Sequence, residues 1–460
     1  MVREILIRLP AKSIFRFKTI SKNWKSITSM TSFIHDYITL NPISSWFIAE
    51  RTVPIKLIPA DSLPFSTELN FQEPPDLSTF LIHQRPDGAT YSRYPKLIAS
   101  SNGLLLVTGM HKPLKLNYLF VINAITDEFL RFPKSPDTFI GGMGVGFITQ
   151  INETNFVTER FVVAEYDPRP GSEFASLTYF SSENAKWEVK SVHCSQKIML
   201  VGDGLYRGAF EFKGNLIWHD IISGLIIWDN PFSKEEIANC RFIGFPLLNF
   251  VEGERMLDCN GSCIQYLEVL KKETNELCLW HLLDEVNGQW IIICHTQIFM
   301  DFWPSPIFIH PFKANVLFFN NEGRIFCMDV FLTDETVHTS SNTVSDVMGE
   351  YSISVERPSF IPVKLSTWPT VFPPYMRATF LKRYGYEAVL ERKFEKAKEY
   401  FTHCLDKMSA YLSPQQIFEV YHGRAVARKG LDDLAGFLED AEEALKLNPD
   451  YYEMVLKDNL

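Results

Sequence analysis

The sequence predicts a multi-domain α+β chain, with helical segments at both ends and a long all-β region between them. Three observations support this fold class. Apolar residues near the N-terminus recur at helical spacing, and residues 45–331 form short β-branched and aromatic runs separated by Gly, Pro, Asn and Asp. After Tyr375, Ala, Glu, Lys and Leu dominate. We expect segments at 1–44, 45–331, 332–374 (a linker) and 375–460, because 460 residues suffice for about three domains.

Composition excludes several classes of protein. The chain is 46% hydrophobic and 14% aromatic, which indicates a folded, β-rich protein, and its net charge of −10 argues against nucleic-acid binding. No apolar run approaches the roughly 18–20 residues of a membrane helix. No secretory leader pattern is present and the eight cysteines form no dense framework, so we expect reduced thiols and a cytoplasmic or nuclear location.

The N-terminal segment is basic and amphipathic. Ile14, Phe17, Ile20 and Trp24 follow helical spacing, and Pro10 should end a shorter helix before them. Seven basic residues and one acid lie within residues 1–30. An organellar transit peptide or a solvated surface helix would also fit this pattern.

The residue string itself favours a third interpretation. Leu9-Pro10, Lys12-Ser13, Arg16-Phe17-Lys18, Ser21-Lys22 and Trp24 fall at the spacing of the plant-type F-box motif, which this stretch resembles, and Phe33 fits its closing aromatic. The resemblance implies a short three-helix module that docks onto the Skp-type adaptor of a cullin-based ubiquitin ligase. Such docking needs apolar anchors. The family begins with a further Leu-Pro upstream of Glu4, so we expect an N-terminally clipped F-box with weakened adaptor affinity. The candidate adaptor contacts, some of which must face the module's own core, are Ile5, Leu9, Pro10, Ile14, Phe17, Ile20 and Trp24.

The sequence of the central region predicts many short strands. Runs at 97–107, 118–123, 160–166, 177–180, 215–219, 225–228, 278–283, 290–294, 316–319 and 324–330 are separated by turn residues. Spacings of roughly 40–50 residues between related hairpins favour a β-propeller of about six blades.

The order of fragments in this region is similar to the plant F-box-associated domain. The fragments are 98–107 with its Ser-Ser-Asn-Gly, 121–128, 144–147, 179–182 with Trp187, and 212–218. The resemblance implies a kelch-like propeller that captures a substrate protein. We predict no metal site and no cofactor, because Cys259 and Cys263 have no second close pair of ligands at regular spacing.

Small and large residues alternate along the C-terminal segment, at Gly385, Ala397, Phe401, Gly423, Ala444 and Pro449. In this pattern the segment resembles a tetratricopeptide repeat (TPR). A plain helical hairpin is the alternative. Two such repeats are too few to form a stable stack alone, so we expect them to pack against the propeller or against another chain. Arg377, Lys382, Arg383 and Arg424 could hold an acidic peptide, which would make a second protein or peptide a partner of this segment.

The resulting hypothesis is a non-catalytic substrate-recognition subunit of a Skp–cullin–F-box ubiquitin ligase. The F-box would bind the adaptor, and the propeller would bind a target protein of unknown identity. The alternatives are a propeller and TPR interaction scaffold without ligase activity, and a propeller enzyme such as a glycosidase, which would need two carboxylates in the propeller mouth within about 10 Å of each other.

Overall fold

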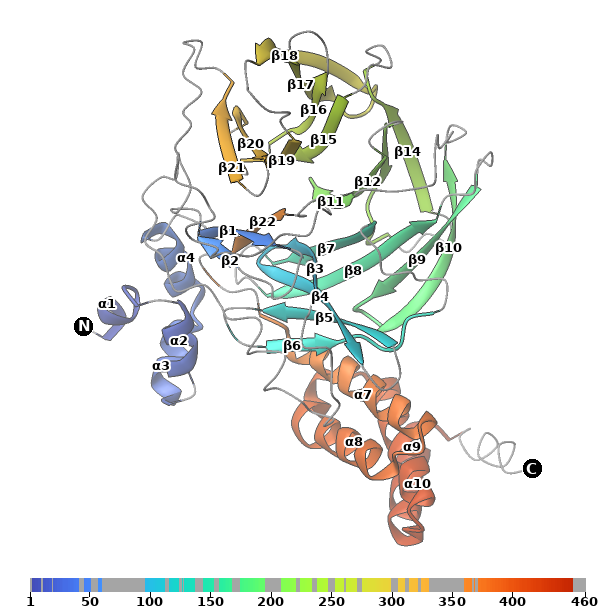
Figure 1. Cartoon of the computed structure of the whole chain (residues 1–460). Helices are drawn as coiled ribbons and strands as arrows, with labels where there is room; N and C mark the ends of the chain where they lie inside the picture. Colours follow the sequence, from blue (N-terminus) through green and yellow to red (C-terminus); the bar gives the residue numbers. More distant parts are fainter. Residues whose placement is uncertain are drawn as a thin grey trace.

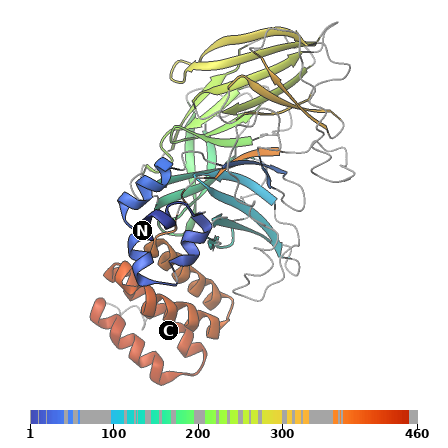
Figure 2. The same cartoon turned by 90° about the vertical axis from the view of Figure 1, so that its left-hand side faces the viewer.

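Helices at both ends of the chain flank a central region of sheets in the computed structural model (Figure 1). Figures 1 and 2 place both groups of helices toward the end of the molecule opposite the sheet of β15–β18. The structure describes residues 2–9, 11–18, 20–40, 45–50, 57–59, 96–111, 116–123, 126, 128–136, 144–152, 157–167, 174–194, 208–220, 224–233, 238–246, 253–259, 262–270, 275–298, 305–310, 314–321, 324–330, 360–365, 368 and 371–449.

The N-terminal module consists of four short helices, where the sequence predicted three segments. They are α1 (Val2–Leu6), α2 (Ala11–Phe17), α3 (Lys22–Thr28) and α4 (Thr31–Leu40). The single amphipathic helix expected across 14–27 is broken, because Ser21 adopts an extended conformation and its side chain caps α3 by accepting from the backbone N–H of Trp24.

Antiparallel sheets begin at β1 (Ser45–Glu50). This strand pairs with β2 (Leu57–Pro59) and with β22 (Phe360–Leu365), which is more than 300 residues away in the sequence. The next sheet has the order β3 (Lys96–Ser101), β4 (Leu104–His111), β5 (Leu116–Asn123) and β6 (Glu128–Arg131). A tight turn joins β3 to β4, since Asn102 and Gly103 both have positive φ, at 47° and 78°.

The largest sheet joins two four-stranded meanders. The first contains β7 (Val145–Ile151), β8 (Thr158–Asp167), β9 (Phe174–Ser181) and β10 (Lys186–Cys194), and the second contains β11 (Gly208–Phe212), β12 (Asn215–Asp220), β13 (Gly224–Trp228) and β14 (Ala238–Gly244). Within each meander the strands are antiparallel, whereas β10 and β14 pair in parallel over three residues.

Two further meanders follow. One contains β15 (Gly253–Cys259), β16 (Ile264–Leu270), β17 (Asn275–Asp284) and β18 (Gln289–Ile298), and the other contains β19 (Ser305–Ile309), β20 (Val316–Asn321) and β21 (Arg324–Asp329). The strand-like runs predicted from the sequence lie on these strands or on a hairpin of two, except that the run 324–330 extends one residue past β21.

First strands of neighbouring meanders lie next to one another, and β22 lies beside two of these strands, an arrangement typical of a β-propeller. β3 lies beside β7, β7 beside β11, β15 beside β19, β19 beside β22, and β22 beside β3. Polar side chains join neighbours in this series: Ser101 Oγ accepts from the Thr149 backbone N–H at 3.0 Å, and Asp258 Oδ2 accepts from the Ile309 N–H at 3.1 Å. The predicted number of blades stays a prediction.

The C-terminal segment forms two helix pairs. They are α7 (Pro374–Leu390) with α8 (Phe394–Met408), and α9 (Pro414–Gly430) with α10 (Leu434–Leu447), with a short 3₁₀ turn (Ser409–Tyr411) between the pairs. The predicted linker at 332–374 contains β22, which belongs to the sheet of β1, and residues 331–359 lie outside the described part of the chain.

Separate apolar cores fill the spaces between neighbouring sheets. One lies between the sheets of β3–β6 and β7–β10, a second between the two meanders of the largest sheet, and two more lie further along the chain. No helix in the described part of the chain is both long enough and apolar enough to span a membrane.

Candidate functional site

The N-terminal helices enclose a small apolar core that includes one residue from far along the chain. Trp368, located between β22 and α7, is only 1% exposed within this core. Its ring centroid lies 5.1 Å from that of Tyr37, 5.3 Å from Phe15 and 6.1 Å from Phe33. The other buried members are Leu6, Ile7, Ala11, Ile14, Phe33, Ile34 and Tyr37.

Lys18 reinforces this connection. Its ammonium group lies 4.0 Å from the ring centroid of Phe15 and 5.2 Å from that of Trp368. Burial lowers the pKa of Lys18 to about 8, with repulsion from Lys25 adding to the shift and the carboxylate of Glu128 opposing it. Because Glu128 begins β6, the charge of Lys18 is also coupled to the central sheets.

The predicted adaptor contacts divide into surface and core. Ile5 and Ile20 are 57% and 70% exposed. Leu9, Phe17 and Trp24 are half-buried, whereas Ile14 is fully buried. Ile14 therefore stabilises the module from inside and cannot contact a partner, while Pro10 lies outside the described residues.

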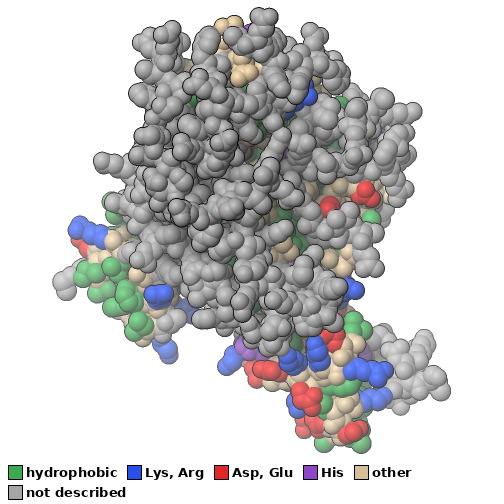
Figure 3. Space-filling model, in the orientation of Figure 1, with side chains coloured by type: hydrophobic (Ala, Val, Ile, Leu, Met, Phe, Trp, Pro, Cys, Tyr) green, Lys and Arg blue, Asp and Glu red, His purple; other side chains and the backbone are tan. Residues whose placement is uncertain are grey.

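Further exposed apolar side chains accompany Ile5 and Ile20 on this module. They are Val2, Met30 and Leu40, which the sequence analysis did not select. Hydrophobic side chains gather over the N-terminal helices at the left of Figure 3. Arg3 donates to the carboxylate of Asp36, and this exposed ion pair links α1 to α4. The exposure of Val2, Met30 and Leu40 could have been expected from their positions, since each residue lies at the end of a short helix or in the turn beside one.

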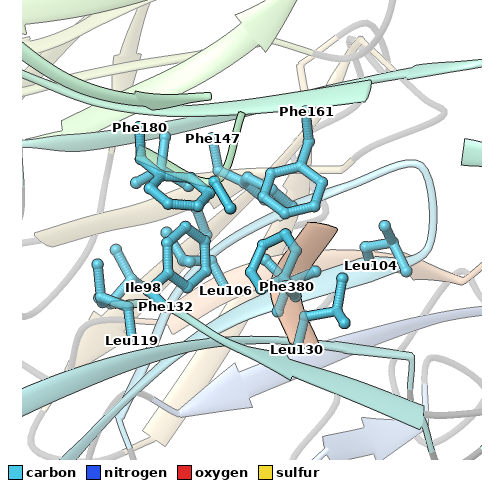
Figure 4. Close-up of a cluster of buried hydrophobic side chains, with 14 of the residues drawn as sticks. Ile98, Leu104, Leu106, Leu119, Leu130, Phe132, Phe147, Phe161, Phe180 and Phe380 are labelled. Carbon is cyan, nitrogen blue, oxygen red and sulfur yellow. The ribbon is translucent and has the colours of Figure 1, made fainter. Parts of the chain in front are cut away.

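Helix α7 is built into the core between two sheets. Phe380 is fully buried and its ring contacts those of Phe132, Phe161 and Phe180, with centroids 5.7–6.3 Å apart (Figure 4). Met376, also buried, extends the same cluster. Burying a phenylalanine stabilises the fold by about 1.5–3 kcal/mol. Helix α7 therefore contributes to the stability of the central region, as the strands of that region do.

Polar groups fix the same helix to β6. The Arg131 guanidinium donates to Glu387 at 3.0 Å, and Arg377 forms an ion pair with Glu128. Burial raises the pKa of Glu387, and the charge of Arg131 opposes that shift. The segment from Trp368 to Glu387 thus contacts the N-terminal module at one end and the central sheets along its length.

Comparison with known families identifies both parts. A family model described as "F-box domain" matches residues 1–36, and one described as "F-box protein At3g26010-like, beta-propeller" matches residues 68–365, more than half of the chain. The chain belongs to this family of F-box proteins. The four N-terminal helices are therefore its F-box, and the central sheets its β-propeller.

Individual relatives agree with this assignment. The F-box/kelch-repeat protein At4g22430 of Arabidopsis thaliana is 24% identical over 80% of this chain and 89% of its own length. The F-box protein At3g26010 of the same plant is 26% identical over 68% of this chain and 72% of its own. Among solved structures, a 6-phosphogluconolactonase from Bacteroides fragilis aligns over 62% of this chain and 91% of its own, with 9% identity and a TM-score of 0.27, which supports no conclusion.

The family matches end at residue 365, before the C-terminal helices. There, Gly385 and Gly423 both lie against the ring of Phe401, where a Cβ atom would be 2.6 Å and 2.3 Å from it. Ala397, Phe401 and Ala444 are fully buried, and Pro449 is exposed after α10. All of these residues except Pro449 pack between paired helices, and the resemblance to TPR proteins stays a prediction.

Three of the four basic residues predicted to hold an acidic peptide already have carboxylate partners within the chain, and the peptide site stays a prediction. Lys382 pairs with Glu419, Arg424 with the buried Asp440 and Arg377 with Glu128. A peptide carboxylate would have to displace partners that are already in place.

The propeller cysteines do not assemble a metal centre in the residues that the structure describes. Cys263 Sγ and His281 Nδ1 are 3.8 Å apart, and burial lowers the pKa of His281. Among the described residues, no group of three or more His, Cys, Asp and Glu side chains could hold a metal ion.

Proposed function

We propose that this F-box protein is the substrate-recognition subunit of a Skp–cullin–F-box ubiquitin ligase in the cytoplasm or nucleus. The observation that carries the proposal is the F-box itself, which matches its family model and keeps Ile5 and Ile20 exposed around a closed core. Apolar side chains presented by short helices are suited to insertion into a partner's groove.

The propeller would hold the target protein. Many of the segments between its strands lie outside the described residues, so the target is defined only as a protein. We propose that six blades form the propeller and that the C-terminal helices are TPR-like.

No side chain of this chain acts as acid, base or nucleophile in the proposal. The ligase complex would work by proximity, because holding substrate and conjugating enzyme in one complex raises the effective concentration of substrate lysines.

Rigid attachment of the F-box supports this role. Trp368 and Lys18 link the F-box to the segment that leads into α7, and α7 is fixed to the propeller by Phe380 and Tyr384. A target bound to the propeller would therefore be held at a defined distance from the adaptor.

Co-purification with a Skp-type adaptor tests the proposal. The full chain should form a stable complex, and the double variant Ile5→Glu with Ile20→Glu should weaken it at least about tenfold, since charged groups resist burial in an apolar groove. Val286→Glu is the matched control, because Val286 is 78% exposed on a propeller turn. Equal binding by the double variant would refute the assigned surface.

The second candidate is an interaction scaffold without ligase activity. It would be favoured if no adaptor complex formed, even with a Leu-Pro segment placed upstream of Glu4. The extensive contacts between α7 and the propeller are compatible with this alternative, since they create one continuous protein surface without involving the F-box.

A further inference from the structure

The two C-terminal helix pairs repeat with a constant offset of 40 residues. Helices α7 and α9 begin at Pro374 and Pro414, and each has 17 residues. The turns that follow them contain Arg392 and Asp432, whose φ values are +56° and +59°. Position by position, α10 is therefore the counterpart of α8.

Helix α8 packs one face against the following helix α9. Phe394 of α8 lies against Gly430, where a Cβ atom would be 2.6 Å from its ring, and Phe401 lies against Gly423. Both phenylalanines thus meet glycines on α9, which lets the two helices approach closely.

The corresponding face of α10 is only partly covered. Forty residues after Phe394 and Phe401 stand Leu434 and Ala441, and Leu438 and Leu445 complete a stripe at helical spacing. Leu434 and Leu438 are 65% and 59% exposed. Ala441 and Leu445 are half-buried, because they also pack against Phe418 of α9 and Ala444 of α10, and they border the exposed leucines. At the opposite end of the helix stack, α7 is covered by the propeller core. One end of the stack is therefore closed and the other is open.

Charge and shape indicate what would fit there. The solvated side of α10 carries three carboxylates, of which Glu439 pairs with Arg428 at 3.4 Å and Glu443 pairs with Lys446 at 2.5 Å. The carboxylate of Glu442 adds a third negative charge, so this side of the helix is negative on balance. Ala441 stands where α8 has Phe401, so α10 itself presents a smaller side chain at this position. A complementary helix would have an apolar face with one bulky residue opposite Ala441 and lysine or arginine beside it.

We propose that the outer face of α10, formed by Leu434, Leu438, Ala441 and Leu445, binds a basic amphipathic helix of a partner protein in the way that α8 binds α9. This surface is distinct from the F-box and from the propeller. Its occupation does not depend on whether the F-box binds an adaptor.

Fluorescence anisotropy with two synthetic peptides tests the proposal on the full chain. Both peptides carry the same leucine and phenylalanine stripe, and one has lysine flanks while the other has glutamate flanks. The lysine peptide should bind at least tenfold more tightly than the glutamate peptide. Leu438→Glu and Leu434→Glu should each weaken binding of the lysine peptide at least tenfold. Val286→Glu, at an apolar site on the propeller that is 78% exposed, should not weaken it.

Four results would overturn the proposal. Equal binding of the two peptides, or unchanged binding by both leucine variants with unchanged circular dichroism, would exclude this surface. Dimerisation in sedimentation that Leu438→Glu abolishes would assign the stripe to a second copy of the chain. Tighter peptide binding after deletion of residues 450–460 would assign it to the chain's own C-terminus.

Discussion

The hydroxyl group of Tyr384 makes two hydrogen bonds to the backbone of Arg131. It accepts from the Arg131 N–H at 2.7 Å and donates to the Arg131 carbonyl oxygen at 2.8 Å. Arg131 ends β6, the outermost strand of its sheet, so a side chain of α7 takes the place that a neighbouring strand would have. Burial raises the pKa of Tyr384, which keeps its phenol protonated and able to donate.

Replacing Tyr384 with Phe should destabilise the protein by about 1–3 kcal/mol, because both backbone groups of Arg131 would lose this partner in a buried setting. Urea denaturation followed by intrinsic fluorescence measures the change. Tyr411→Phe is the control, since Tyr411 is 52% exposed and should change stability by less than about 0.5 kcal/mol. Equal stability of the two variants would show that the α7 contact is incidental.

Replacing Trp368 with Ala should open the F-box while leaving the propeller folded. Removing a buried tryptophan costs about 3–5 kcal/mol. Hydrogen exchange measured by mass spectrometry should show faster exchange across residues 11–38 and little change across β7–β9. Trp228→Ala, at a residue 2% exposed in a propeller core, should show the opposite pattern. Uniform destabilisation by both variants would contradict a local role for Trp368.

The stability of the protein should rise with pH between about 8 and 10 through Lys18. Its pKa is about 8 in the folded state against an ordinary value of 10.5, so within this window the unfolded chain holds a proton that the folded chain has released. Removing protons from solution therefore favours folding. Thermal denaturation at several pH values should show this slope, and Lys18→Met should reduce it. The same slope in Lys18→Met and in the exposed control Lys186→Met would refute the assignment.

Replacing Gly423 with Ala should destabilise the C-terminal helices by about 1–3 kcal/mol, because the new methyl group would overlap the ring of Phe401. Adding Phe401→Leu to this variant should recover part of the loss, since leucine leaves room for the methyl group. Helical circular dichroism on heating measures both effects. A double variant less stable than the sum of the two single changes would show that the overlap is not the cause.

The sequence predicted the strands well because their signals are local. Asn102 and Gly103 fix a tight turn through their own backbone preferences, and the runs on either side have the branched and aromatic side chains that strands favour. The same local signals failed at Ser21. Its neighbours continue an apolar helical pattern, but its extended backbone ends one helix and caps the next.

Tertiary contacts of the candidate site were beyond sequence reasoning. Nothing near Trp368 in the sequence shows that it belongs in a core formed mainly by the first 40 residues. The basic residues Lys382 and Arg424 suggested a peptide site because their partners, Glu419 and Asp440, are brought to them only by helix packing. The exposure of Ile5 and Ile20 agrees with the predicted surface, and their contact with an adaptor stays a prediction.

The position of Trp368 also has a consequence for the order of synthesis. The first 40 residues leave the ribosome long before Trp368, since at about 5–20 residues per second the intervening stretch takes roughly 15–65 seconds to translate. Until then Tyr37 and Phe33 lack the indole that fills their core. The N-terminal module of a nascent chain is thus completed only after the strands between residue 40 and Trp368 have been made. This order disfavours assembly of an unfinished polypeptide with partners of that module.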